Sequence, residues 1–137
     1  MLAKPATSSA GVALLRLRCP RCHQGPLFTH SALSLTKFDE MPESCPVCGQ
    51  HYEPETGFYW GAMYISYGLA VGVVVVAGFL TYFLGHDPST WVYVTVVAGC
   101  MVLLTPLMFR YARALMLYLF GGIHYDPAAA ARRSAAD

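Results

Sequence analysis

The sequence predicts an α-helical membrane protein: a two-helix transmembrane hairpin with a small N-terminal β zinc-ribbon module and a C-terminal interfacial helix. Three observations predict this fold. Residues 60–84 carry no charged side chain, and a helix of that length can cross a hydrocarbon core of about 30 Å. A second apolar stretch, residues 91–109, follows after a short turn. Four cysteines in two Cys-x-x-Cys pairs precede both stretches.

The composition excludes an ordinary soluble domain. Of the 137 residues, 55% are hydrophobic and 12% are charged, whereas soluble domains are about one quarter charged. A chain of this size could not bury so long an apolar rod on all sides. The formal net charge of +1 provides no bulk attraction to nucleic acid, which we therefore do not expect as a partner.

Residues 1–15 are expected to form a flexible N-terminal arm, because they are mostly small and polar. Their apolar piece, residues 11–15, is too short for the core of a cleavable signal peptide. We therefore expect the first transmembrane helix to act as the insertion signal.

Residues 16–57 are predicted to form a cytoplasmic metal module. Each cysteine pair has proline at its second position, which favours a tight turn with both sulfurs on one side. Two such turns supply four thiolates to one tetrahedral site, at about 2.3 Å from a zinc ion. The module would hold one structural zinc, and that metal would supply most of its folding free energy. The predicted ligands are Cys19, Cys22, Cys45 and Cys48.

Two alternatives apply to this site. Iron is the alternative metal, because the pairs also resemble the knuckles of rubredoxin and a tetrahedron of sulfurs suits both metals. Disulfides would require an oxidising compartment. His23 and His51 follow the two pairs, and we expect them to be exposed at turns rather than to bind metal. The segment between the pairs alternates roughly and predicts short strands.

Residues 58–109 are predicted to form the hairpin in the lipid bilayer. Trp60, Tyr64 and Tyr67 share one face of the first helix, as an aromatic anchor at the headgroup level does. We favour this interpretation over a quinone or haem site.

Small residues predict how the two helices meet. Gly61, Gly68 and Gly72 lie on one face of the first helix, where the absence of side chains permits close approach. We expect this face to be buried against the second helix near Ala98 and Gly99.

The remaining expectations concern the start of the second helix, Cys100 and the residues that follow the second span. Asp87 and Pro88 are expected to start the second helix, and Cys100 is expected to serve packing. Residues 110–125 predict an interfacial helix that ends at two glycines, and residues 126–137 predict a disordered tail.

The distribution of basic residues predicts the orientation. All nine lysines and arginines lie before the first span or after the second, and the turn between the spans has none. The positive-inside rule then places both termini and the cysteine module in the cytoplasm. The basic residues are Lys4, Arg16, Arg18, Arg21, Lys37, Arg110, Arg113, Arg132 and Arg133.

The motifs Cys-Pro-Arg-Cys, Gly-Pro-Leu-Phe and Cys-Pro-Val-Cys-Gly, followed by the aromatic entry Gly-Phe-Tyr-Trp, resemble the DUF983 family of small bacterial membrane proteins. The resemblance covers residues 16–118, with His23 where many members have glycine. It implies a multi-pass protein of the bacterial inner membrane. The family has no established activity, and some members occur beside haem–copper oxidase genes, which implies a role around respiratory complexes.

We expect a non-enzymatic protein, because no nucleophile–base set, phosphate loop or open metal position is recognisable, and no small-molecule substrate is indicated. The first function expected is an accessory subunit or assembly factor of a larger membrane complex, with a haem–copper oxidase as the first candidate. The alternatives are a rubredoxin-like one-electron carrier and a metal chaperone for oxidase assembly. The expected docking surface of the module contains Phe28, Leu33, Leu35 and Phe38.

Overall fold

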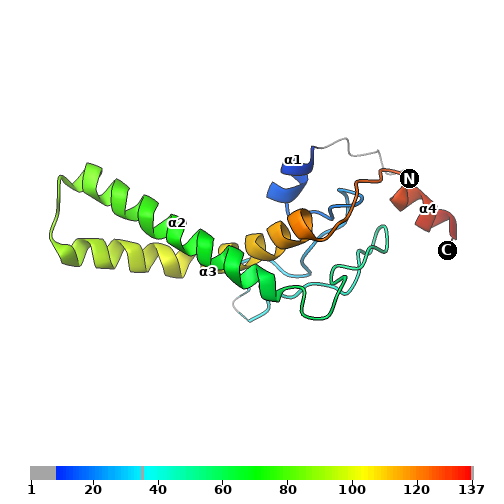
Figure 1. Ribbon diagram of the computed structural model, residues 1–137, viewed down its shortest axis with the longest axis horizontal. Helices are drawn as coiled ribbons and strands as arrows, with labels where there is room; N and C mark the ends of the chain where they lie inside the picture. Colours follow the sequence, from blue (N-terminus) through cyan, green and yellow to red (C-terminus); the bar gives the residue numbers. More distant parts are fainter. Residues whose placement is uncertain (1–8, 35, 137) are drawn as a thin grey trace.

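A computed structural model describes residues 9–34 and 36–136. Its elements are four helices: α1 (Ala10–Leu15), α2 (Trp60–Gly85), α3 (Thr90–Phe120) and α4 (Ala129–Ala136). Figure 1 shows α2 and α3 as a hairpin whose turn lies at one end of the molecule. The cysteine-rich segment, α1 and α4 lie at the other end.

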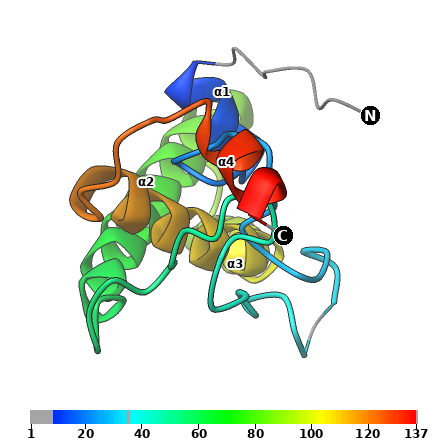
Figure 2. The same ribbon diagram turned by 90° about the vertical axis from the view of Figure 1, so that its right-hand side faces the viewer.

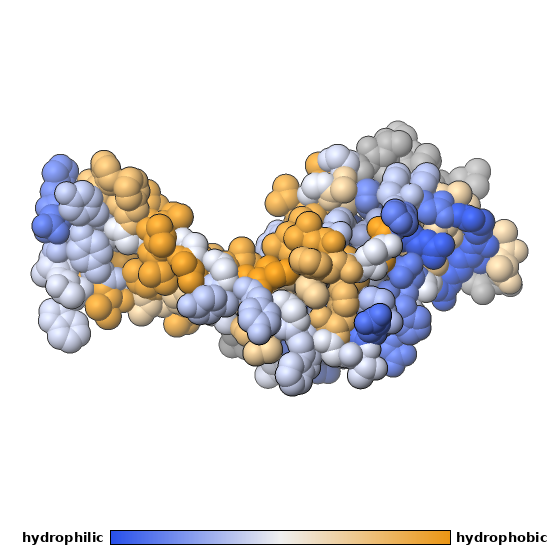
Figure 3. All heavy atoms as spheres, viewed as in Figure 1, coloured by the Kyte–Doolittle hydropathy of each residue, from blue (hydrophilic) through white to orange (hydrophobic). Residues whose placement is uncertain are grey.

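Helices α2 and α3 are both long and apolar enough to span a membrane. Many of their large hydrophobic side chains are exposed, and hydrophobic residues cover much of the hairpin in Figure 3, whereas hydrophilic residues gather over the module. The predicted start of α2 at Trp60 is confirmed, and the helix ends one residue beyond the predicted span. The aromatic side chains of Trp60, Tyr64 and Tyr67 are all exposed, as membrane anchors require.

The turn of the hairpin differs slightly from its prediction. His86 and Asp87 both adopt left-handed conformations, with φ of 52° and 62°. Ser89 rather than Asp87 is the N-cap of α3, because Asp87 is used in the tight reversal of the chain. Gly85 is the last residue of α2, as expected.

The predicted interfacial helix over residues 110–125 does not form as a separate element. Helix α3 continues without interruption to Phe120. Two arginines of the expected interfacial helix donate to the cysteine-rich segment: Arg110 to the carbonyl of His30 at 2.9 Å and Arg113 to that of Asp39 at 2.6 Å. The C-terminal end of α3 is therefore part of the module.

The expected packing of the glycine face is wrong for most of its length. A side chain at Gly61 would meet Met116 of α3, but nothing lies within 4 Å of the positions of side chains at Gly68, Gly72 and Gly99. The two helices cross and then separate, so that Gly68 and Gly72 line an open apolar groove of about 510 Å³. Of the three glycines on this face of α2, only Gly61 therefore lies close to a side chain of α3.

The module contains no β-strand among the residues that the structure describes. Two isolated antiparallel bridges, Arg18 with Pro26 and Ser44 with His51, stand where a ribbon was expected. Each cysteine turn is too short to extend its pairing, and the segments between them pack instead on α3.

The core lies where the module surrounds the end of α3. Leu27 and Tyr52 of the module pack with Ala114 and Leu117 of α3 and with Ala129 of α4. Figure 2 shows α4 and the module loops gathered in front of the hairpin. Residues 129–136, expected to belong to a disordered tail, are helical because α4 contributes Ala129 to this core.

Candidate metal centre

The first cysteine pair sits on a tight turn. The backbone N–H of Cys19 donates to the carbonyl of Gly25 at 2.8 Å, and that of His23 donates to the carbonyl of Cys19 at 2.9 Å. The bridge between Arg18 and Pro26 closes the turn at its base. His23 has a positive φ of 56°, which lets the chain reverse immediately after Cys22.

The second cysteine pair repeats this geometry. The N–H of Cys45 donates to the carbonyl of Gln50 at 2.8 Å, and that of Gly49 donates to the carbonyl of Cys45 at 2.9 Å. Gly49 follows Cys48 with a φ of 74°, a conformation that glycine adopts without steric cost. We call the two turns, residues 19–25 and 45–50, the first and second knuckles.

The knuckles bring all four predicted ligands together in the interior. Their sulfur atoms all lie within 4.8 Å of one another, and all four cysteines are buried. The sulfurs of Cys19 and Cys48 are 3.7 Å apart, and those of Cys22 and Cys45 are 3.8 Å apart. A regular tetrahedron with metal–sulfur bonds of about 2.3 Å has sulfurs about 3.8 Å apart. The four cysteines can therefore bind one metal ion.

The thiols strongly influence one another's proton affinity. Hydrogen bonds with the thiols of Cys19 and Cys22 hold the pKa of Cys45 far below its usual range. Hydrogen bonding to Cys22 and Cys45 raises the pKa of Cys19. Burial raises the pKa of Cys48 to about 11. Thiolate is the form that binds metal, so a cation bound here would take the place of the shared protons.

Residues that the sequence analysis did not identify complete the site. The space beside Gly25 is occupied by the sulfur of Cys45, so no side chain fits there. The hydroxyl of the buried Tyr52 donates to the carbonyl of Pro26 at 2.9 Å and joins the segments that follow the two knuckles. Gly25 belongs to the Gly-Pro-Leu-Phe motif, which was the only sequence signal for it. Nothing in the sequence distinguishes Tyr52 from the other tyrosines.

The two histidines beside the knuckles differ. His51 is exposed, as expected, but His23 is buried, with 6% of its surface exposed. The ring of His23 stacks on that of Tyr125, with centroids 4.2 Å apart, and a sequence pattern could not reveal this long-range contact. Cys100 lies in α3 away from the cluster and lines the apolar groove between the helices.

The expected docking surface is largely occupied by the protein itself. Phe28 is buried beneath the guanidinium of Arg110, whose carbon lies 4.4 Å from the ring centroid. Phe38 packs edge-on against Phe109 of α3 at 6.1 Å. Leu33 is 90% exposed, and Leu35 lies outside the described residues.

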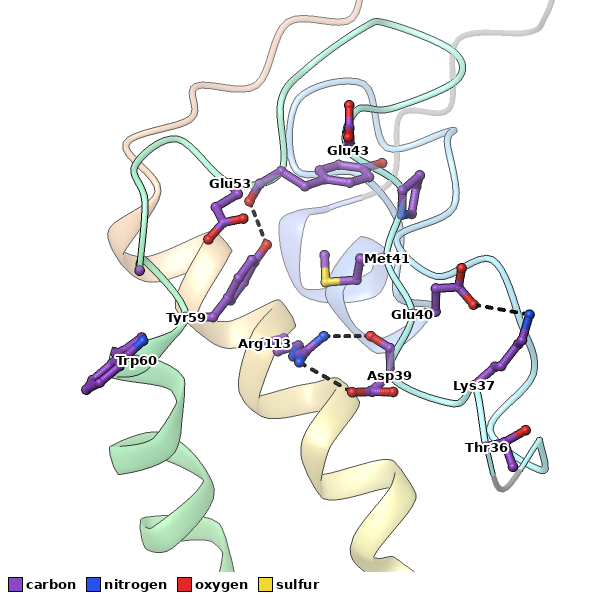
Figure 4. A pocket seen from close by; sticks show the side chains of 13 residues that line it. Thr36, Lys37, Asp39, Glu40, Met41, Glu43, Glu53, Tyr59, Trp60 and Arg113 are labelled. Atoms are coloured by element: carbon purple, nitrogen blue, oxygen red, sulfur yellow. Dashed lines mark hydrogen bonds and ion pairs between the residues drawn. The ribbon is translucent and has the colours of Figure 1, made fainter.

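A pocket of about 860 Å³ lies between the module and the start of α2 (Figure 4). Four of its charged side chains form two pairs, Arg113 with Asp39 at 3.4 Å and Lys37 with Glu40 at 4.0 Å. The hydroxyl of Tyr59 donates to the carbonyl of Tyr52 at 2.5 Å. These contacts fasten the module to both long helices.

Most of the elements described above fall within a region that matches a known protein family. A family model described as "Protein of unknown function (DUF983)" matches residues 35–120. The match includes the second knuckle and both long helices, and the first knuckle precedes it. Comparison with curated proteins and with solved structures gives no match. Because the model covers more than half of the sequence, the chain belongs to the DUF983 family.

Proposed function

We propose that this protein is a non-enzymatic zinc protein of the bacterial inner membrane, acting as an accessory subunit or assembly factor of a larger membrane complex. The hairpin spans the membrane, and one structural zinc holds the module at its cytoplasmic surface. A respiratory haem–copper oxidase is the first complex to test.

The sulfur geometry is the observation that carries the proposal. Four buried thiols with tetrahedral spacing form a closed set of ligands, which is typical of structural zinc. A catalytic zinc keeps an open coordination position, and four thiolates leave none. Burial of all four sulfurs also favours a retained metal over a metal that is passed to another protein.

The membrane orientation rests on the hairpin and its flanking charges. In the sequence the lysines and arginines all lie before the first span or after the second, and the turn between α2 and α3 has none. The positive-inside rule then favours a cytoplasmic module with both termini on the same side. Reducing conditions in the cytoplasm keep thiols available for metal.

Contacts between the module and α3 support an adaptor role. Arg110 and Arg113 reach from α3 to the backbone between the knuckles, so the metal-held loops are fixed relative to the membrane helices. A surface fixed in this way is suited to binding a membrane partner. Among the described residues of the expected docking surface, the exposed Leu33 is available for such contact.

The iron alternative remains part of the proposal because the same sulfur tetrahedron suits iron. With iron bound, the module would act as a one-electron carrier to a membrane partner. Its visible absorption would distinguish it from zinc, which absorbs no visible light.

Co-purification from native membranes tests the adaptor role. We expect the wild-type protein to carry a larger complex, and Cys45→Ser to lose it while remaining in the membrane, because the module unfolds without its metal. Leu33→Asp should weaken the association with the module still folded, and Cys100→Ser should have no effect. Equal recovery of the same partners with Cys45→Ser and Leu33→Asp would refute docking through the module.

A further inference from the structure

The chain returns over the cysteine cluster after α3 ends. We call residues 123–136 the C-terminal strap; it contains α4 and lies beside the module in Figures 1 and 2. The backbone N–H of Asp126 donates to the carbonyl of Arg21 at 2.8 Å, within the first knuckle. Ala129 is 5% exposed and packs in the same core as the four cysteines. The strap is therefore docked on the cluster.

The strap contacts the first knuckle through an aromatic stack. The Tyr125 and His23 rings are 4.2 Å apart between centroids and inclined by 25°. His23 directly follows Cys22 and is itself buried, so the stack covers the turn that presents this sulfur.

The strap contacts the second knuckle through a charged side chain. Nη1 of Arg133 donates to the carbonyl of Cys45 at 3.3 Å. The same guanidinium lies against Gly49, where any side chain would collide with it. Gly49 occupies the position after Cys48 that His23 occupies after Cys22. The strap thus contacts the equivalent residue of each knuckle.

The contact of Arg133 with the second knuckle also has an electrostatic effect. Four thiolates and one divalent ion carry a net charge of −2, and burying that charge is unfavourable unless cations or hydrogen bonds compensate it. Arg133 brings a permanent positive charge to the second knuckle. The neighbouring Arg132 pairs with Asp126 instead, and both arginines are exposed, so they differ in the groups that they contact. The two arginines of α4 therefore have different surroundings.

We propose that the C-terminal strap closes the metal site, and that Arg133 is a positioning residue that stabilises the negatively charged, metal-loaded cluster. This inference rests on the proposed metal binding by the four cysteines. The strap limits access to the sulfurs, and the guanidinium slows loss of the ion.

Metal release from the purified full-length protein tests the role of Arg133. Zinc transfer to a chromophoric chelator should be about tenfold faster in Arg133→Gln, since groups around metal ligands typically change metal affinity by 10- to 100-fold. Arg133→Lys should recover much of the wild-type rate because it keeps the charge. Arg132→Gln is the matched control and should stay within about twofold of wild type, as exposed pairs contribute little. Equal rates in Arg133→Gln and Arg132→Gln, or no recovery in Arg133→Lys, would overturn the role of Arg133.

Thiol alkylation of the full-length protein as purified, with no metal removed, tests closure separately. Deleting residues 127–137 removes α4 and should raise the alkylation rate of the four clustered cysteines at least severalfold, with Cys100 as an internal reference. An unchanged rate would overturn the closure. If the wild-type protein bound no metal, the proposed function would fail, whereas this comparison would still decide whether the strap covers the sulfurs.

Discussion

At the scale of single residues, the metal centre depends on one position that lacks a side chain. Gly25 adjoins the sulfur of Cys45, so Gly25→Ala would push the two knuckles apart. We expect a loss of about 1–3 kcal/mol in the stability of the module, as in other overpacked interiors, and weaker metal retention. The measurements are the midpoint of thermal unfolding and the zinc content after dialysis against a chelator.

Gly11→Ala is the control for this prediction. Nothing lies within 4 Å of a side chain added at Gly11, which is in the short helix α1. This variant should retain metal and stability. Equal behaviour of Gly25→Ala and Gly11→Ala would contradict the close approach of the knuckles.

The sequence predicted the ligands but not the residues that support them. Two Cys-x-x-Cys pairs directly indicate a shared metal site, because four cysteines rarely form disulfides in a reducing compartment. Tyr52 and Gly25 act through contacts with residues more than 15 positions away, and such contacts leave no local pattern. His23 was expected to be exposed because its partner, Tyr125, lies about 100 residues further along the chain.

At the scale of elements, the crossing of α2 and α3 distinguishes glycines that look equivalent in sequence. Gly61→Leu should destabilise the hairpin by about 1 kcal/mol, because the added side chain must displace Met116, which is flexible. Gly68→Leu should be tolerated, because its side chain would enter the open groove. Unfolding of the purified protein in mild detergent, followed by circular dichroism, compares the two variants.

The reverse order of stability would contradict this crossing geometry. Loss of a co-purified partner in Gly68→Leu, with stability unchanged, would instead identify the groove as a contact with another protein. Val74→Leu serves as the control, since Val74 has an exposed side chain in the middle of α2.

Both ends of α2 and the start of α3 were predictable to within one residue, because uncharged length is a strong signal. The β-strands, the separate interfacial helix and the disordered tail were not observed in the described residues. In each case the local structure is determined by packing against distant residues rather than by the local sequence pattern. The knuckles pair by single bridges, α3 extends into the module, and α4 contributes Ala129 to the core.

At the scale of the whole molecule, the module and the hairpin are one unit. Four residues between the knuckles contact residues 109–113 of α3 through an aromatic pair, a cation–π contact and hydrogen bonds to backbone carbonyls; they are Phe28, His30, Phe38 and Asp39. The sequence predicted two separate parts, since contacts between segments so distant in the chain have no periodic signature. A module joined to the two long helices in this way supports the proposed adaptor role.

The central claim is that zinc on four cysteines holds this shape. Elemental analysis of protein purified in mild detergent, combined with a visible absorption spectrum, tests it most directly. We predict about one zinc per chain and no visible absorption, with the metal lost in Cys45→Ser and retained in Cys100→Ser. Stoichiometric iron with visible absorption, or protein without metal whose four clustered cysteines form disulfides, would contradict the claim.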